Sequence, residues 1–128
     1  MRYLLDTHTF LWFINGDRQL SEKAKKAIDN PDAIKRISIA SLWEIAIKLN
    51  IGKLKIDMTF ENLWQQIDKN GFELLPIKFE HTLELCSLEL HHRDPFDRMI
   101  IAQSLVEDLT LISKDSNVAK YEGLRILW

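Results

Sequence analysis

The chain has 128 residues, of which 46% are hydrophobic and 28% are charged, a composition that suits one globular domain with one core. The formal net charge of −2 argues against bulk electrostatic capture of nucleic acid, although it leaves room for a local basic patch. A single cysteine, Cys86, excludes an internal disulfide and a cysteine-rich zinc site, and its apolar neighbours predict an inert core residue. Because Asp6 interrupts the first apolar run and no apolar segment reaches about 18 residues, we expect a cytoplasmic protein without a signal peptide or membrane span.

Apolar runs with the length of strands alternate with segments of helical periodicity along the chain. Strands are predicted at residues 3–5, 36–39, 72–77, 110–113 and 125–127. Helices are predicted at residues 8–14, 21–28, 41–50, 59–70, 80–90 and 94–108. Since this alternation implies right-handed crossovers, we expect one α/β domain over residues 1–128, with a mainly parallel sheet covered on both faces.

Four acidic residues lie at the ends of predicted strands or at the starts of predicted helices. Asp6 and Asp115 fall just past strands, whereas Glu44 and Asp97 fall in the first turns of helices. Ligands of parallel α/β sheets bind beyond the carboxyl ends of the strands, so we expect these side chains to gather at one edge. Carboxylates gathered there would bind Mg²⁺, and two such ions roughly 4 Å apart can activate a water and stabilise the leaving oxygen in phosphate chemistry.

Each of these acids also has a structural explanation when it is taken alone. Asp6 can be a turn or cap residue, and Asp115 can cap a last short helix. Ser41 and Glu44 match the capping box, in which the glutamate reaches back to the amide of the cap. The run Asp94-Pro95-Phe96-Asp97 matches a cap, a first-position proline and an acid that the helix dipole favours. Capping does not require acids at four junctions on one sheet edge, whereas metal binding does.

Four segments, in chain order, carry a resemblance to a known family. They are Leu5-Asp6-Thr7-His8-Thr9; Ser41-Leu42-Trp43-Glu44-Ile45-Ala46-Ile47-Lys48 with Gly52-Lys53-Leu54 behind it; His91-His92-Arg93-Asp94-Pro95-Phe96-Asp97-Arg98; and Leu111-Ile112-Ser113-Lys114-Asp115. In these segments the chain resembles the PIN-domain nucleases, and within them the VapC-like branch of type II toxin–antitoxin ribonucleases that carries a DPFDR signature. The resemblance covers essentially the whole chain, and its DPFDR and WEIAIK segments are the specific ones.

The resemblance implies a fold, an activity and partners. The fold would be a three-layer α/β/α sandwich around a five-stranded parallel sheet. The activity would be Mg²⁺- or Mn²⁺-dependent hydrolysis of RNA phosphodiester bonds, and the partners would be the RNA, a small antitoxin protein and a second copy of the chain. The acidic metal ligands of the family would fall on Asp6, Glu44, Asp97 and Asp115.

Further site residues follow from the same resemblance. Asp97 is preferred over its neighbour Asp94 as the third ligand, because the helix after it resembles the family's stretch at that point. Asp94 is then a helix cap or an outer partner of the metal site. Thr7 and Ser113 resemble small hydroxyl residues near the acids, and Ser113 would orient a carboxylate or a water.

Two cations are candidate phosphate clamps, Arg98 and Lys48. Lys48 lies four residues after Glu44 on the same helix face, so an exposed Glu–Lys pair is the alternative interpretation. Arg98 follows Asp97 directly and can equally be its structural ion-pair partner. Basic residues after Gly52, namely Lys53 and Lys55, make a loop that either touches RNA or is merely solvated.

Histidines and tryptophans suggest other sites, which we weigh as follows. His8, His91 and His92 lack the spacing of a zinc site, and oxygen ligands dominate the pattern. The tryptophans lie among aliphatic residues and are predicted in the core or at an interface rather than as base-stacking platforms. Apolar faces of the early helices are candidates for a homodimer surface or an antitoxin groove. These faces include Trp12, Phe13 and Trp43, and the two remaining tryptophans are Trp64 and Trp128.

Other functions fit the pattern less well than a nuclease does. A receiver-type signalling domain has the right size, but it requires paired acids after its first strand, where this chain has Asp6-Thr7-His8. A phosphatase with a nucleophilic aspartate requires a second aspartate at the position of His8. A PIN fold that has lost catalysis and serves as a binding module remains an alternative, which the presence of all four acids disfavours.

Overall fold

The computed structural model describes residues 1–128. Its elements, in chain order, are β1 (Arg2–Leu5), α1 (Thr7–Asn15), α2 (Glu22–Asp29), β2 (Ile34–Ser38), α3 (Ile39–Asn50), α4 (Phe60–Lys69), β3 (Glu73–Leu75), α5 (Phe79–Ser87), α6 (Pro95–Val106), β4 (Thr110–Ile112), the 3-10 helix η1 (Val118–Lys120) and β5 (Ile126–Leu127). None of the helices is both long and apolar enough to cross a membrane.

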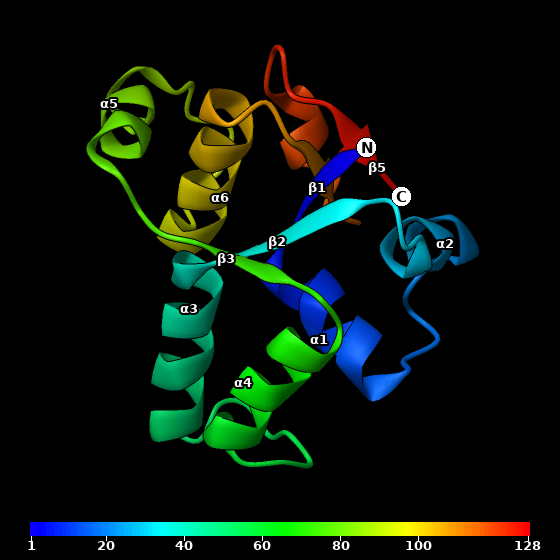
Figure 1. Ribbon diagram of the computed structural model, residues 1–128. Helices are drawn as coiled ribbons and strands as arrows, with labels where there is room; N and C mark the ends of the chain where they lie inside the picture. The colour runs from blue at the N-terminus through cyan, green and yellow to red at the C-terminus, as the bar shows by residue number, and fades with distance from the viewer.

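The five strands form one sheet in the order β3-β2-β1-β4-β5, and every neighbouring pair is parallel. The short β1 lies at the centre of the sheet, where Leu5 is in register with Ile37 of β2 and Ile112 of β4. Helices lie on both sides of the sheet (Figure 1). The predicted α/β class and the five-stranded parallel sheet are therefore confirmed.

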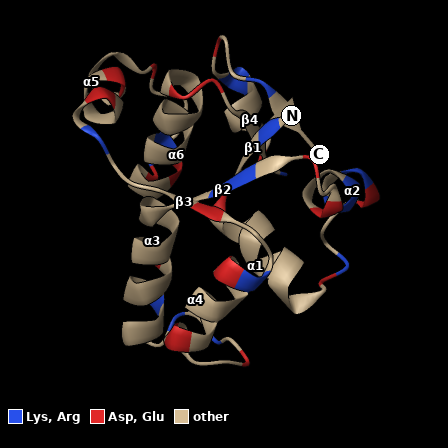
Figure 2. Cartoon of the chain, in the orientation of Figure 1, with Lys and Arg blue, Asp and Glu red and all other residues tan.

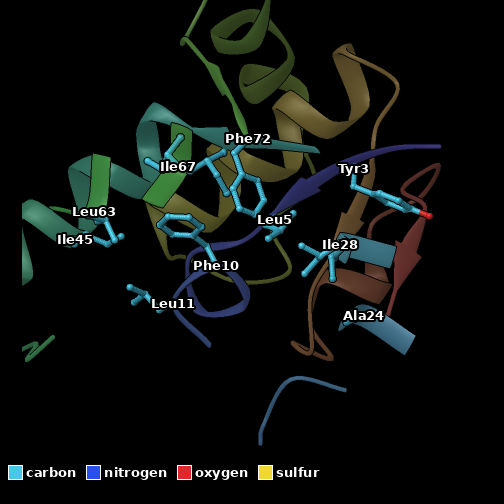
Figure 3. Close-up of a cluster of buried hydrophobic side chains, with 12 residues drawn as sticks. Tyr3, Leu5, Phe10, Leu11, Ala24, Ile28, Ile45, Leu63, Ile67 and Phe72 are labelled. Atoms are coloured by element: carbon cyan, nitrogen blue, oxygen red, sulfur yellow. The ribbon is translucent and has the colours of Figure 1, made fainter. Parts of the chain in front are cut away.

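Two hydrophobic clusters lie on the opposite faces of the sheet, because neighbouring side chains of a strand point to opposite sides. Tyr3 and Leu5 of β1 belong to the cluster formed with α1, α2 and α4, which Figure 3 draws. Leu4 belongs to the second cluster, under α6. Helix α3 contributes to both, Ile45 to the first and Ala40 to the second, so it packs between the two helical layers.

The junction between β2 and α3 differs from the prediction. Ser38 ends the strand in an extended conformation and caps the helix, since its side chain accepts a hydrogen bond from the Ala40 N–H at 2.9 Å. The helix thus begins at Ile39, and Ser41 lies inside it. The predicted capping box of Ser41 and Glu44 is wrong, and Glu44 lies in the second helical turn rather than the first.

Several apolar residues are exposed: Cys86 was predicted in the core, whereas Trp43 and Trp64 were predicted in the core or at an interface. Helix α5 buries only His81, so Cys86 on another face of that helix is exposed and the core prediction for it is wrong. Helix α4 buries Leu63 and Ile67, and Trp64 points away from that face. Trp43 of α3 is also exposed.

A buried histidine joins α5 to α6. The Lys78 backbone N–H donates to Nδ1 of His81 at 2.9 Å, so the other ring nitrogen carries the proton and faces Glu107 Oε2 at 2.8 Å. Arg36 of β2 also lies 3.8 Å from the Glu107 carboxylate. The hydrogen bond from His81 is the main cause of the lowered pKa of Glu107. This contact ties the outer helix α5 to the sheet through α6.

We expect His81→Leu to lower the free energy of unfolding at pH 7 by about 2 to 3 kcal/mol, because it removes the only close hydrogen bond of Glu107 and the acceptor of the Lys78 N–H. A carboxyl group with a lowered folded-state pKa stabilises the fold above its unfolded pKa and loses that effect as pH falls through the folded value. The difference between the variant and the wild type should therefore shrink in acid. Urea denaturation at several pH values measures this difference.

Leu83→Ala, at an exposed position of the same helix, is the control and should change stability by less than about 0.5 kcal/mol. Equal losses in the two variants would contradict the account.

Candidate active site

The acidic residues meet where the strand order reverses. From β1 the chain proceeds to β2 and β3 on one side of the sheet and later returns to β4 and β5 on the other side. The loops after β1 and β4 therefore diverge and leave a cleft between them, the usual ligand site of such sheets. This cleft has a volume of about 270 Å³. Its lining residues are Asp6, His8, Trp12, Asp97, Lys114 and Asp115.

Asp6 follows β1 directly and caps α1. Its Oδ1 accepts the Thr9 N–H at 2.9 Å, and the Ser113 hydroxyl also hydrogen-bonds its carboxylate. Burial is the largest influence on this group and raises its pKa, against the lowering effect of those hydrogen bonds. The carboxylate is held rigidly at the floor of the cleft by α1 and the loop after β4.

Asp97 lies in the first turn of α6, which Asp94 and Pro95 start. The Asp94 side chain accepts the N–H groups of Phe96 and Asp97 at 2.9 and 3.0 Å, and Pro95 takes the first helical position. Asp94 is thus the helix cap and does not line the cleft, whereas Asp97 does. Burial, followed by repulsion from neighbouring carboxylates, raises the pKa of Asp97 to about 7. The repelling groups, in decreasing order, are Asp94, Asp6, Glu44 and Asp115.

Glu44 lies behind the cleft rather than on its wall. It is only 4% exposed and receives a hydrogen bond from Thr7 Oγ1 at 2.7 Å and one from Lys48 Nζ at 2.6 Å. Ser41 Oγ lies 3.0 Å from the Thr7 hydroxyl. The hydrogen bond to Glu44 is the main reason that the pKa of Lys48 is raised. The Glu–Lys pair of α3 is therefore present, but Glu44 is buried and the pair is not the exposed one that was predicted. Both Glu44 oxygens already have donors.

Asp115 is positioned by a network of local hydrogen bonds after β4. Its backbone N–H donates to Ser113 Oγ at 3.1 Å, and its Oδ1 accepts the Asn117 N–H at 2.9 Å. One alternative interpretation was that Asp115 caps the last short helix. That helix, η1, begins at Val118 and has Asn117 at its cap position, so this alternative is wrong. Ser113 thus contacts two segments of the site, since its side chain reaches both Asp6 and the Asp115 backbone.

Arg98 points away from the cleft and holds the loop before α6. Its Nη1 donates to the carbonyl of Glu89 at 2.8 Å and to the Tyr121 hydroxyl at 3.1 Å, and its Nη2 donates to the Leu88 carbonyl at 3.2 Å. These hydrogen bonds occupy the guanidinium group with acceptors of the protein itself, and no carboxylate forms an ion pair with it. In this conformation Arg98 is neither a phosphate clamp nor the ion-pair partner of Asp97.

Three residues of the cleft were not assigned to the site from the sequence. The rings of His8 and Trp12 stack with centroids 5.6 Å apart, and Lys114 Nζ lies 5.8 Å from the Trp12 ring. The spacing of four residues between His8 and Trp12 in the first helix was the signal available for the pair. Lys114 stands between Ser113 and Asp115, and this position in the strand-end loop was its signal. Trp12 lies at the cleft and is only half-buried, so it is not a core residue, while its prediction at an interface stays a prediction.

His92 also reaches the site, although it was set aside as a metal ligand. Its Nε2 lies 3.8 Å from Asp97 Oδ2. Potential ligand atoms of His92, Asp97 and Asp115 all lie within 4.8 Å of one another. The helix-capping loop brings this histidine to the cleft, a placement that residue spacing alone does not predict.

The donor set fits a hard divalent cation. Asp6, Asp97 and Asp115 come from three separate segments and present carboxylate oxygens to one cleft. Lys114 is the one lysine or arginine that lines this cleft. Burial, followed by repulsion from the neighbouring acids, raises the pKa of Asp97 to about 7, and a bound cation would relieve that repulsion. Oxygen ligands of this kind suit Mg²⁺ or Mn²⁺.

Solved structures with the same fold come from toxin–antitoxin complexes. The chain aligns with VapBC2 from Rickettsia felis bound to a DNA fragment from their promoter, with a TM-score of 0.72, 16% identity and coverage of 99% of this chain and 98% of that chain. DNA-bound VapBC from Salmonella typhimurium aligns with a TM-score of 0.69 and 14% identity, over 99% of this chain and 97% of that chain. VapBC-5 from Mycobacterium tuberculosis, a member of the VapBC family of toxin-antitoxin systems, aligns with a TM-score of 0.66 and 18% identity, over 98% of this chain and 97% of that chain.

Comparison of the sequence with protein-family models assigns the chain to a family. No curated protein matches the chain in sequence. The model of the PIN domain family matches residues 3–124, which include all four acids, the switch point and every strand except the last. The chain therefore belongs to the PIN domain family.

Proposed function

We propose that this protein is a divalent-metal-dependent endoribonuclease that hydrolyses RNA phosphodiester bonds. The observation that carries the proposal is the convergence of Asp6, Asp97 and Asp115 on one cleft, where Asp97 has a pKa of about 7. Three carboxylates that repel one another form a poor structural feature but a good cation site. Membership of the PIN domain family supports the same assignment.

The residues of the cleft divide the work between them. Asp6, Asp97 and Asp115 would hold the ion, which when bound supplies a Lewis acid that offsets charge on phosphoryl oxygens. Asp97 would also accept the proton of the attacking water, since its carboxylate lines the same cleft. Glu44 lies behind these groups, where it adds negative charge and orders Thr7 and Lys48.

The substrate side of the cleft carries the complementary charge. Lys114 is exposed and would contact a backbone phosphate of the RNA. The half-buried Trp12 and its stacked partner His8 offer an aromatic wall beside it. Lys53 and Lys55 lie exposed in the loop between α3 and α4, and we keep them as more distant RNA contacts.

We further propose that the nuclease is the toxin of a type II toxin–antitoxin pair in the cytoplasm, with a small antitoxin protein and a second copy of the chain as partners. The names of the structurally similar complexes support this assignment. Helix α3 has only two charged residues and appears largely uncharged in Figure 2. Its exposed Trp43 and the 75% exposed Phe79 of α5 supply apolar surface of the kind that partners cover.

The first test replaces the three cleft carboxylates singly. Asp6→Asn, Asp97→Asn and Asp115→Asn should each lower RNA cleavage in Mg²⁺ or Mn²⁺ by about 100-fold or more, because even outer partners of a metal contribute 10- to 100-fold. Cleavage by the wild type should vanish in EDTA. Asp68→Asn, on the exposed side of α4, is the matched control and should cleave normally. Undiminished cleavage in the three site variants would reveal a contaminant and refute the site.

A second prediction concerns pH and the metal-free protein. A carboxyl group whose folded-state pKa is raised weakens the fold as pH rises from its unfolded pKa toward about 7. Asp97→Asn should therefore raise the free energy of unfolding at pH 8 by about 1 to 2 kcal/mol. This total is smaller than ~1.4 kcal/mol for every unit between the ordinary pKa and about 7, because the side chain keeps some contact with water. At pH 4 the gain should disappear.

The cation should compete with the proton for the same carboxylate. Thermal melts should show that Mn²⁺ stabilises the wild type more at pH 8 than at pH 6, and that it stabilises Asp97→Asn at neither. A variant that is destabilised at pH 8 without metal would contradict the proposed repulsion.

A third prediction concerns Lys114. Lys114→Ala should raise KM for RNA by about tenfold with little change in kcat, because it removes a phosphate contact and leaves the acids in place. The plot of log affinity against log salt concentration should also become less steep. Lys69→Ala, an exposed lysine of α4, should behave as the wild type. A loss confined to kcat would instead assign Lys114 to the chemical step.

A further inference from the structure

The Nε2 atom of His92 and the carboxylate of Asp97 face each other in the site without a hydrogen bond between them. The His92 Nε2 atom is buried and has no hydrogen-bond partner. It lies 3.8 Å from Asp97 Oδ2, which is too long for a hydrogen bond. Hydrogen bonds of active sites are often long in the ligand-free state and shorten on binding. A small rotation of the Asp97 carboxylate would join the two groups.

The other ring nitrogen of His92 indicates which nitrogen carries the proton. Nδ1 lies 2.8 Å from the Tyr121 hydroxyl, and the same hydroxyl oxygen accepts a hydrogen bond from Arg98. A guanidinium can only donate, so the proton of Tyr121 is free to be donated in turn. Tyr121 is 4% exposed, and Nδ1 is the acceptor within its reach. The chain Arg98 to Tyr121 to His92 therefore leaves Nδ1 bare and the proton on Nε2.

The opposite tautomer would make His92 a metal ligand, but it leaves a buried donor unpaired. With the proton on Nδ1, the Tyr121 oxygen would accept from both His92 and Arg98. Its own proton would then have no acceptor in the interior, which is unfavourable for a buried donor. The hydrogen-bond pattern favours His92 as a donor toward Asp97.

We propose that His92 is a positioning residue of the active site, whose Nε2–H donates to the Asp97 carboxylate and fixes its orientation toward the cation and the substrate. The inference rests on the proposed metal-dependent function. It also gives Arg98 and Tyr121 a purpose at the site, since they select the tautomer that His92 needs. Such outer donors commonly orient carboxylate ligands.

The tautomer is measured first, because this measurement requires neither metal nor RNA. Long-range ¹H–¹⁵N correlation spectra of protein labelled at histidine, recorded at pH 8, distinguish protonated from bare ring nitrogens. His92→Gln identifies the signal. A protonated Nε2 with a bare Nδ1 is expected, and the reverse would overturn the proposal.

Metal binding is measured next, by calorimetry with Mn²⁺ and by cleavage assays. His92→Leu should weaken Mn²⁺ affinity and lower kcat by about 10- to 100-fold. His92→Gln, whose amide can donate from a similar position, should recover at least half of the loss on a logarithmic scale. His91→Leu is the matched control, because His91 contacts Glu89 and the Tyr121 ring but not Asp97. Thermal melts check that the variants fold.

The outcomes separate this inference from the function on which it rests. A wild type that binds Mn²⁺ and cleaves RNA, beside a folded His92→Leu that does both equally well, would overturn the role of His92 alone. A His92→Gln no better than His92→Leu would reduce His92 to a structural residue and also overturn it. A wild type that binds no Mn²⁺ would overturn the proposed function and with it this role.

Discussion

The repulsion among carboxylates at the carboxyl edge of the sheet is the constraint on which the site depends. Burial of Asp97, followed by repulsion from four other acids, raises its pKa to about 7; these acids are Asp94, Asp6, Glu44 and Asp115. Carboxylates repel one another, so they stay close together only where the fold holds them. Here three rigid connections hold them, namely the turns after β1 and β4 and the start of α6.

The fold keeps the acids in place by satisfying each one locally. Asp6 caps α1 and also accepts from Ser113, while Asp94 caps α6. Glu44 is held between Thr7 and Lys48. Asp97 is the exception, since no hydrogen bond reaches its carboxylate oxygens and the Nε2 atom of His92 lies 3.8 Å from Oδ2. The least satisfied acid is therefore the one with the most to gain from a cation.

The sequence could predict the sheet and most of the site, because both follow from local patterns. Apolar runs ended by acids marked the strand ends, and of the four acids predicted to gather beyond them, Asp6, Asp97 and Asp115 line one cleft, whereas Glu44 does not. The phase of α3 could not be predicted in the same way. The alternation of Ile37, Ser38 and Ile39 reads as strand, whereas the Ser38 side chain starts the helix.

What the sequence could not supply depends on contacts between distant segments. Arg98 binds the carbonyls of the preceding loop, and Tyr121, which follows η1, completes its shell. His92 enters the site only because that loop folds against Tyr121. Cys86 stands exposed because α5 packs on one helix and buries a single narrow face. Residue spacing carries no information on such contacts.

Diffraction from crystals grown with Mn²⁺ tests the central claim most directly, since anomalous scattering locates the ion without reference to activity. The account predicts a peak in the cleft, about 2.1 Å from carboxylate oxygens of Asp6, Asp97 and Asp115. A cleft that stays empty at Mn²⁺ concentrations that support cleavage, or an ion bound only by acids elsewhere on the surface, would contradict it.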